Sequence, residues 1–228
     1  MNAFKTTVFD CLSSTQDYLR ARPDDKDVCV IAKRQKSGKG TKDRSFSSET
    51  GGVYLSFRKT YANLQAKDAF QVMASAAVAV CKTVESYGVT PKIKWANDVF
   101  VNGKKICGIL IENRLSGGFV ESALVGVGLN VNNALPTELQ DTAITLSALV
   151  GETPVEEVTE RLLSYLCAPF DFADYENRLG FVGEEVGLFF DGSTQKAIFL
   201  GVDRRGNLRA QIDGEEKTFS AVELRITK

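Results

Sequence analysis

The chain has 228 residues, 28 lysines and arginines against 29 aspartates and glutamates, and no histidine. Without histidine the protein cannot use a Ser-His or Cys-His pair or a His-ligated zinc ion, so its chemistry must rest on carboxylates, lysines, amides, backbone N–H groups or a bound metal ion. A net charge of −1 provides no overall attraction to nucleic acid or to an anionic membrane, and no apolar run approaches the roughly 18 residues of a membrane span.

The amino-terminal part is expected to combine short strands with one helix and one long polar stretch. Residues 34–51 are rich in glycine, serine, threonine and basic side chains. A structureless stretch of that length is uncommon inside a compact domain and is usually functional or disordered. The predicted elements are a strand at Phe4–Phe9, a helix capped by Ser13 or Ser14 and ending near Arg22, and strands at Val28–Lys33 and Gly52–Arg58.

The longest predicted helix begins with Asn63 as its cap and stops at Gly88. Its apolar side chains recur at spacings of three and four, which is typical of a helix with one face in the core. We interpret this stripe as core packing. Its members are Phe70, Met73, Ala74, Ala77, Val80, Cys81, Val84 and Tyr87.

The second half of the chain predicts hairpins, then helices, then short strands. Asn102-Gly103 and Gly117-Gly118 have the composition of tight hairpin turns, and Pro154 is suited to a helix start. From Glu185 onward, short strands broken by Asp-Gly and Gly-Asn pairs suggest a small β-barrel. The other predicted elements are strands at Lys92–Trp95, Val99–Val101, Lys105–Asn113 and Gly118–Val131, and helical structure from Leu146 to about Leu179.

The five cysteines are odd in number, widely spaced and form no C-x-x-C pair. This predicts small buried thiols in a reducing compartment rather than a disulfide framework or a zinc knuckle. The amino terminus, MNAFKTTVFD, lacks the basic segment and long apolar run of a secretory signal, so we expect a cytoplasmic protein. The cysteines are Cys11, Cys29, Cys81, Cys107 and Cys167.

Three segments resist a purely structural interpretation, and the first is the glycine-rich stretch 35–44. Gly38 and Gly40 would let backbone N–H groups converge on an anion, while Lys39, Lys42 and Arg44 supply positive charge. The pattern is neither G-x-x-x-x-G-K-[ST] nor G-x-G-x-x-G, so neither named phosphate motif applies. A solvated flexible loop with scattered basic residues explains it equally well.

The second segment, 92–98, contains the only tryptophan and is joined by a hairpin to 104–110. Asp98 is suited to holding a divalent cation or receiving a proton, and Lys105 to neutralising a carboxylate or phosphate. The alternative is a tryptophan packed in the core beside an Asn-Asp turn, with lysines on the surface. The residues alone do not choose between these interpretations.

The third segment is the strand 124–132. Because side chains alternate along a strand, Gly126, Gly128 and Asn130 share one face. Two glycines inside a strand cost stability and leave an empty groove. The groove accommodates either another segment of the chain or a ligand that Asn130 would contact.

Together, in this order and spacing, the segments resemble the biotin protein ligase family. The family's GRGR…W.S and GG.Y.S blocks are similar to Gly38–Thr41 with Phe46–Ser48 and to Gly51–Ser56. Its KWPND…KK..GIL.E resembles Lys94–Asp98 with Lys104–Glu112, and its G.G.N.N strand resembles Gly126–Asn132. D-S-T-N-Q is similar to Ser13–Asp17, and the small carboxy-terminal barrel to Gly201–Asp203, Gly206–Leu208 and Glu223–Arg225.

The resemblance implies an α+β fold: a mixed sheet flanked by helices, as in class II synthetases and biotinyl/lipoyl ligases, over residues 1–182, and an SH3-like barrel over 183–228. It also implies that ATP activates biotin as biotinyl-AMP, which a lysine of a biotin carboxyl carrier protein or carboxylase domain then attacks. Magnesium would be bound mainly through the ATP phosphates, with Asp98 the nearest carboxylate. The long loop would order over the hydrolysable intermediate and exclude water.

Site residues follow from the same resemblance. The catalytic candidates are Lys105 and Lys39, which would stabilise the reacting carboxylate and α-phosphate, and Asp98, which would accept or orient a proton. The biotin-binding candidates are Ser14, Thr15, Gln16, Gln35, Gly38, Lys39, Gly40, Thr41, Lys105 and Gly108. The nucleotide-binding candidates are Arg44, Phe46, Lys94, Asn97, Asp98, Gly128 and Asn130.

The chain departs from the family pattern in three places. Lys39 and Thr41 stand where the family has arginines, which removes a bidentate donor and one charge and should weaken retention of the intermediate. Ala96 replaces a proline and loosens its turn. The first strand begins within about five residues of the start, which leaves no room for a DNA-binding domain, so neither a nucleic-acid partner nor a membrane partner is expected. Whether the protein is a homodimer is left open.

Two rival functions stay open. Lipoyl and octanoyl ligases or transferases belong to the same superfamily, but they resemble one another in an R-R-x-x-G-G-G-x-V-x-H-D segment that a chain without histidine cannot contain. A non-catalytic adaptor that binds biotin or nucleotide would keep the ligand and leave an acceptor domain unlabelled.

Overall fold

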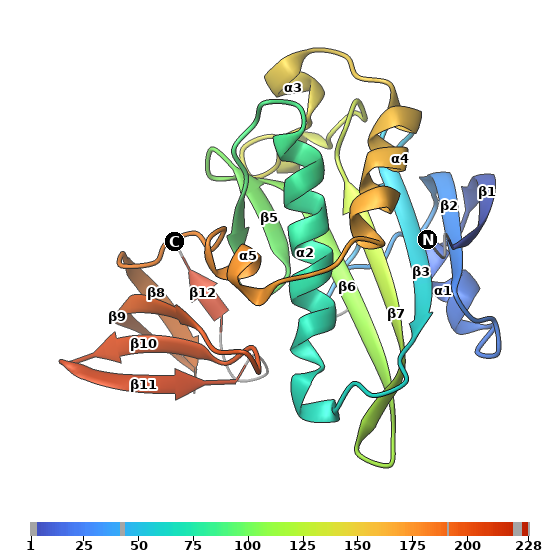
Figure 1. The fold of residues 1–228 in the computed structure, drawn as a ribbon. Helices are drawn as coiled ribbons and strands as arrows, with labels where there is room; N and C mark the ends of the chain where they lie inside the picture. The colour runs from blue at the N-terminus through green and yellow to red at the C-terminus, as the bar shows by residue number, and fades with distance from the viewer. Residues whose placement is uncertain (1–3, 42–43, 191, 221–224, 228) are drawn as a thin grey trace.

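A seven-stranded mixed sheet forms the centre of the molecule (Figure 1). The computed structural model describes residues 4–41, 44–190, 192–220 and 225–227. The strand order is β1-β2-β3-β7-β6-β5-β4, with β1 parallel to β2 and every other neighbouring pair antiparallel. The strands are β1 (Lys5–Leu12), β2 (Val28–Gln35), β3 (Val53–Thr60), β4 (Lys92–Lys94), β5 (Asp98–Val101), β6 (Lys104–Ser116) and β7 (Phe119–Leu129).

The two faces of the sheet are covered by different helices. α2 (Phe70–Glu85) and α4 (Val155–Leu166) lie over one face, and the short helix α1 (Thr15–Arg20) packs on the other (Figure 1). The alternation predicted for β7 is confirmed, because Val125 and Val127 join the core under α2 while Gly126 faces Gln16 of α1. One face of the sheet is therefore packed against α2 and α4. On the opposite face, α1 and the glycines of the strands leave space for a cavity.

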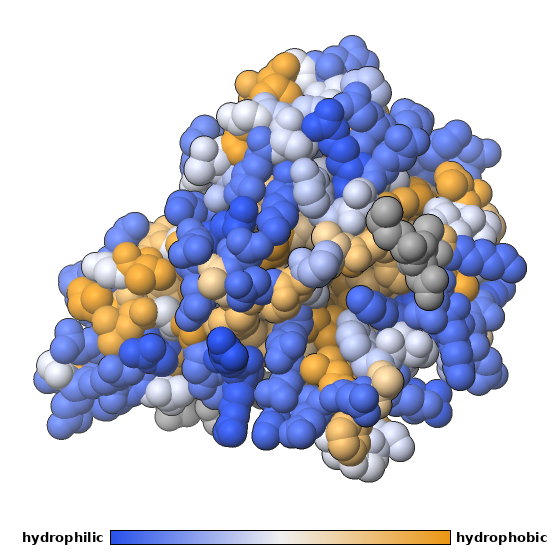
Figure 2. Space-filling view, viewed as in Figure 1, coloured by the Kyte–Doolittle hydropathy of each residue, from blue (hydrophilic) through white to orange (hydrophobic). Residues whose placement is uncertain are grey.

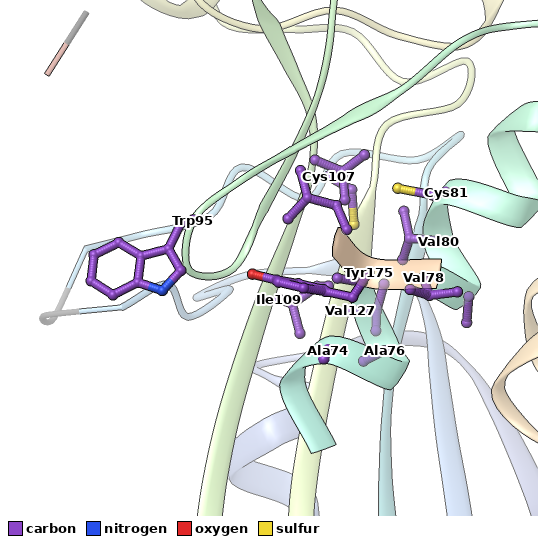
Figure 3. Packing of buried hydrophobic residues seen from close by; sticks show 14 of the residues in the cluster. Ala74, Ala76, Val78, Val80, Cys81, Trp95, Cys107, Ile109, Val127 and Tyr175 are labelled. Carbon is purple, nitrogen blue, oxygen red and sulfur yellow. The ribbon is translucent and has the colours of Figure 1, made fainter. Parts of the chain in front are cut away.

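The packed face is a continuous apolar core (Figure 3). Small residues of α2, such as Ala74 and Ala77, are fully buried and allow the helix to lie close to β6 and β7. This confirms that the apolar stripe of the predicted helix is a packing surface. Burial also raises the pKa of the Cys29 thiol to about 12, so that thiol is protonated and inert near neutrality. Cys81 and Cys107 are buried as predicted, whereas Cys11 and Cys167 are exposed, contrary to the prediction.

The predicted start of the longest helix was wrong. α2 begins at Phe70, after a 3-10 turn η1 (Ala66–Asp68), and its cap is Ala69 rather than Asn63. The backbone before it is used elsewhere, since Val120 N–H donates to Leu64 O and Ala66 N–H to Gly118 O. The predicted helical structure from Leu146 to about Leu179 is confirmed, and it consists of α3 (Ser147–Val150), α4 and α5 (Phe172–Glu176). A 3-10 turn, η2 (Thr137–Leu139), precedes it.

Local backbone chemistry explains where these helices begin and end. Gly151 has a φ of +87° and ends α3, and Pro154 caps the start of α4, where a missing N–H costs nothing. Asp171 caps α5 by accepting from Ala173 N–H at 3.1 Å. Ser14 caps α1 in the same way through Asp17 N–H, which confirms one of the two predicted caps. None of the described helices is long and apolar enough to cross a membrane.

The carboxy-terminal strands form a five-stranded antiparallel sheet in the order β11-β10-β9-β8-β12. Among the described residues β11 pairs only with β10 and β12 only with β8, so the strands predicted to form a small barrel make an antiparallel sheet that is not closed. Glu223 and Leu224 lie outside the described residues. The division at residues 182/183 stays a prediction. The strands are β8 (Glu185–Phe190), β9 (Ser193–Val202), β10 (Leu208–Ile212), β11 (Glu215–Phe219) and β12 (Arg225–Thr227).

Apolar side chains also gather on the outside of this second sheet. In the space-filling view, apolar residues lie over the strands β8 and β9, whereas much of the remaining visible surface is polar (Figure 2). Two large hydrophobic residues are exposed in or just before β8, namely Phe189 and Val182.

Trp95 joins the two sheets. Its buried indole N–H donates to the Gly206 carbonyl at 3.0 Å, and a Cβ on Gly206 would lie 2.3 Å from the ring of Phe70. Of the two interpretations left open, core packing is therefore the one that holds for the tryptophan itself. The turn that carries Asn97 and Asp98 is thereby fixed to the carboxy-terminal sheet.

Trp95→Phe is expected to lower the free energy of unfolding by about 1–2 kcal/mol, because the buried Gly206 carbonyl loses its donor. Urea unfolding followed by circular dichroism measures the change. Tyr165→Phe is a control, since Tyr165 packs against the core and its hydroxyl makes no hydrogen bond within residues 4–41, 44–190, 192–220 and 225–227. Equal stabilities of Trp95→Phe and the unsubstituted protein would contradict the role of this bond.

Candidate active site

A cavity of about 750 Å³ lies on the α1 face of the sheet. It is bordered by the start of α1, the loop after β2, the turn between β4 and β5, and the glycine positions of β6 and β7. Every predicted site residue except Gly38 lines it. The lining members are Ser14, Thr15, Gln16, Gln35, Lys39, Gly40, Thr41, Arg44, Phe46, Lys94, Asn97, Asp98, Lys105, Gly108, Gly128 and Asn130.

The described part of the loop after β2 folds back on itself. Gly40 N–H donates to Arg44 O at 2.7 Å and Phe46 N–H to Gly38 O at 2.8 Å. Gly38 is needed for this approach, because a Cβ there would lie 2.4 Å from the Phe46 carbonyl oxygen. The Gly40 N–H is therefore used inside the loop, and the loop offers a ligand mainly the Lys39 and Arg44 side chains. Lys42 lies outside the described residues.

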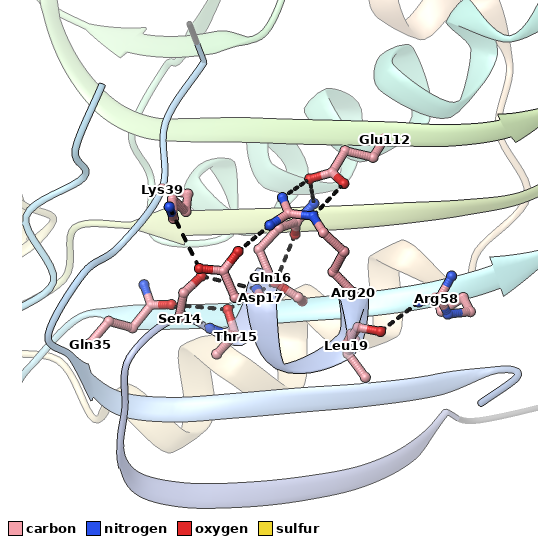
Figure 4. A network of polar contacts seen from close by, with 11 residues as sticks. Ser14, Thr15, Gln16, Asp17, Leu19, Arg20, Gln35, Lys39, Arg58 and Glu112 are labelled. Carbon is pink, nitrogen blue, oxygen red and sulfur yellow. Dashed lines mark hydrogen bonds and ion pairs between the residues drawn. The ribbon is translucent and has the colours of Figure 1, made fainter. Parts of the chain in front are cut away.

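One end of the cavity, at the start of α1, is lined by uncharged hydrogen-bonding side chains, among them Thr15, Gln16 and Gln35, which Figure 4 shows beside a charged network. Gln35 Oε1 accepts from Thr15 N–H at 2.8 Å and from Thr15 Oγ1 at 3.1 Å, and its amide nitrogen donates to Ser48 Oγ at 2.9 Å. Thr15 Oγ1 lies 2.8 Å from Ser56 Oγ, which donates to Gln16 Oε1 at 3.1 Å. These side chains fix one another, so this end is preorganised for a small polar group.

The other end of the cavity is charged. Lys105 Nζ lies 2.7 Å from Asp98 Oδ1, and both side chains are largely shielded from solvent. Burial lowers the pKa of Lys94, while Asp98 raises it and Lys105 lowers it by smaller amounts, so this end of the cavity is partly dry. Asn97 donates to the Ile109 carbonyl at 2.8 Å and so holds the turn against β6.

The protein groups present do not fit a resident magnesium ion. Asp98 is paired with Lys105, and the described residues contain no cluster of three or more acidic or cysteine side chains that would hold a metal.

The glycine face of β6 and β7 is filled by side chains of the chain itself. A Cβ on Gly128 would lie 2.5 Å from Phe46 Cε1, and one on Gly126 would lie 2.7 Å from Gln16 Oε1. The packing alternative therefore holds for the strand, and Phe46 and Gln16 form a wall of the cavity. Asn130 is buried, and its Oδ1 accepts from Asn133 Nδ2 at 3.2 Å.

Sequence reasoning missed one whole wall of the cavity. Residues 135–143 lie against β6, where Lys105 N–H donates to Thr142 O at 2.8 Å and Ile144 N–H to Lys105 O at 2.9 Å. The only local signal would have been Asp141, a carboxylate in an otherwise unremarkable loop. The residues missed include Ser56, Phe100, Leu135, Leu139, Asp141, Thr142, Ala143 and Phe181.

Glu112 gives the polar network an acid sensitivity. Arg20 Nε donates to it at 2.9 Å and Gln16 at 3.0 Å, and the bond from Arg20, followed by that from Gln16, lowers the pKa of Glu112. A carboxyl whose pKa is lowered by folding stabilises the fold above its unfolded pKa, near 4.5, and loses that contribution as pH falls through the folded pKa.

Glu112→Gln is therefore expected to reduce the stability difference between pH 7 and pH 3. Urea unfolding at both pH values measures it. Glu152→Gln, outside the network, should keep the difference of the unsubstituted protein, and an unchanged difference in Glu112→Gln would contradict the assignment.

Comparisons with known proteins agree with this geometry. The sequence model of the Biotin/lipoate A/B protein ligase family matches residues 8–130. The chain is similar to the bifunctional ligase/repressor BirA of Bacillus subtilis, with 36% identity over 151 residues, which are 63% of this chain and 46% of that protein. It thus spans about half the length of that relative.

Other relatives match over most of their length. The biotin–[acetyl-CoA-carboxylase] ligase of Paracoccus denitrificans is 29% identical, with 78% of this chain and 82% of that protein covered. The biotin protein ligase of Aquifex aeolicus, solved in complex with biotin and ATP, has a TM-score of 0.83 at 25% identity and covers 98% of this chain and 99% of its own. The chain belongs to the biotin/lipoate A/B protein ligase family.

Proposed function

We propose that the protein is an ATP-dependent biotin protein ligase, which forms biotinyl-AMP and transfers the biotinyl group to a lysine of a biotin carrier domain. The observation that carries the proposal is the division of a single cavity into a neutral, hydrogen-bonding end and a cationic end. Biotin has a ureido ring at one end and a carboxylate at the other, and its carboxylate must meet the polyphosphate of ATP. The similar protein of Aquifex aeolicus was solved with both substrates.

The neutral end favours biotin over a lipoyl or octanoyl group. A ureido group needs both donors and acceptors, and Thr15, Gln35 and Ser56 supply hydroxyl and amide groups that already hold one another in place. A dithiolane or an alkyl chain offers no donor or acceptor to these groups, so it would gain no hydrogen bond at this end of the cavity. This difference supports biotin as the substrate over lipoate or octanoate.

The first step needs positive charge where two anions meet. The biotin carboxylate oxygen attacks the α-phosphorus, the bond to the bridging oxygen breaks, and pyrophosphate leaves. Lys105, with Lys39 and Arg44 of the loop, would offset the charge that develops, and preorganised cations in a water-poor cavity do this effectively. Magnesium enters with ATP as part of the substrate.

In the second step the acceptor amine attacks the acyl carbon and AMP leaves. An ordinary lysine amine has a pKa of about 10.4 and must give up a proton during the attack. Asp98 is the carboxylate of the cationic end and lies 2.7 Å from Lys105, so we propose it as the group that orients or accepts this proton. Phe46 and Asn130 would lie against the adenosine.

Acceptor labelling tests the substrate class. The protein is incubated with ATP, magnesium, a biotin carrier domain, and either biotin, lipoate or octanoate, and the mass of the acceptor is measured. We expect one biotinyl group on one lysine and no product from the other two acids. Labelling with lipoate or octanoate in preference to biotin would favour the rival ligase, and retained biotin without labelling would favour a non-catalytic adaptor.

A further inference from the structure

Asp17, in the first turn of α1, connects the helix with the loop after β2. Its Oδ2 lies 3.7 Å from Lys39 Nζ, and its Oδ1 is paired with Arg20 (Figure 4). In the loop, the Lys39 backbone forms an isolated antiparallel β-bridge with Ser45, and Lys39 lines the cavity. Among the described residues, the Asp17 carboxylate is therefore the ion-pair partner that connects the Lys39 ammonium group to α1.

Asp17 is itself anchored to the sheet. Arg20 bridges it to Glu112 of β6, with Arg20 Nε at 2.9 Å from Glu112 Oε2. Glu112 accepts from Gln16 at 3.0 Å, and Gln16 accepts from Ser56 in the cavity wall. A continuous set of contacts thus runs from the neutral end of the cavity to Lys39, and it crosses three elements of the fold.

Two simpler roles for Asp17 do not account for these contacts. In a capping box, the carboxylate at the third helical position would bond back to the backbone N–H of the cap residue, whereas the described partners of this carboxylate are Arg20 and Lys39. An isolated surface ion pair would contribute little, but this one belongs to a network of four charges attached to β6.

We propose that Asp17 is a positioning residue for Lys39, an inference that rests on the proposed ligase function. The Lys39 side chain is 47% exposed, so without a partner its four-carbon stem would sample many rotamers in solvent. Asp17 keeps the ammonium group beside the cavity, and the arriving carboxylate and phosphates then take it over.

A double-mutant cycle tests the proposal. Asp17→Asn is expected to lower kcat/KM for ATP in biotin-dependent pyrophosphate exchange by about two- to fivefold, mainly through KM, as suits a half-exposed ion pair. In a Lys39→Met background the same substitution should have no further effect, because Asp17 would act only through Lys39. Asp17→Glu should recover part of the loss. Asp10→Asn removes a comparable surface pair with Lys33, outside the cavity, and should leave exchange unchanged.

A second measurement does not depend on activity. The rate at which an amine-reactive ester modifies Lys39, read by mass spectrometry of peptides, should rise about two- to fivefold in Asp17→Asn and stay unchanged in Asp10→Asn. Equal Lys39 labelling in Asp17→Asn and the unsubstituted protein would overturn the inference, as would an equal loss of exchange in the Lys39→Met background. No exchange by the unsubstituted protein, with labelling of Lys39 still controlled by Asp17, would refute the ligase function and leave the positioning role standing.

Discussion

Lys105→Ala is expected to lower biotin-dependent pyrophosphate exchange by at least about 100-fold, the size of effect seen when a preorganised group that stabilises developing charge is removed. The ammonium group is held by Asp98 at 2.7 Å, and the Lys105 backbone is bonded on both sides to the segment 142–144. Its Nζ would lie 3.1 Å from a Cβ on Gly108 of the same strand, so the side chain lies in the space that this glycine leaves.

Two controls separate chemistry from stability. Lys104→Ala removes the neighbouring lysine, whose Nζ donates to Gln140 O at the surface, and should keep near-normal exchange. Lys105→Ala also leaves Asp98 without its partner, so Lys105→Ala/Asp98→Asn should recover stability to urea but not exchange. Exchange by Lys105→Ala within a few fold of the unsubstituted protein would show that the charge is supplied elsewhere.

Gly128→Ala is expected to raise KM for ATP by about tenfold or more, because a methyl group at that position would lie 2.5 Å from Phe46 Cε1 and force the ring into the cavity. Overpacking of a well-packed site costs roughly 1–3 kcal/mol, which corresponds to about 5- to 150-fold in an affinity. Isothermal titration with a non-hydrolysable ATP analogue measures the effect on binding directly.

The control for this prediction is a glycine at which an added methyl group would fit without a clash. A Cβ on Gly180 would meet its neighbours at an ordinary 3.4 Å, so Gly180→Ala should leave the affinity unchanged. Gly128→Ala/Phe46→Ala relieves the clash and should bind the analogue better than Gly128→Ala alone. If Gly128→Ala bound the analogue as tightly as the unsubstituted protein, Phe46 would not be part of the nucleotide wall.

Much of the fold and the site could be predicted because the signals are local. The alternation along β7, the stripe of α2, the Asn102-Gly103 turn and the cap at Ser14 each depend on residues within a few positions of one another. The charged and glycine-rich positions of the site fall in such segments, which is why nearly all of them line one cavity.

The remainder depends on contacts between distant segments. The wall at 135–143 has no distinctive composition, and it reaches the site only because Thr142 and Ile144 bond to the Lys105 backbone. The start of α2 is displaced because Leu64 pairs with the β6–β7 hairpin, a choice that helix propensity does not reveal. The openness of the carboxy-terminal sheet likewise depends on which edges pair, and composition predicts strands but not closure.

The proposed ligase function is tested most directly by the exchange of labelled pyrophosphate into ATP by the purified protein with magnesium, with and without biotin. We expect exchange only when biotin is present, and none with lipoate or octanoate in its place. Exchange that does not depend on biotin, or no exchange at any biotin concentration while ATP and biotin still bind, would contradict the claim that this cavity joins the two substrates.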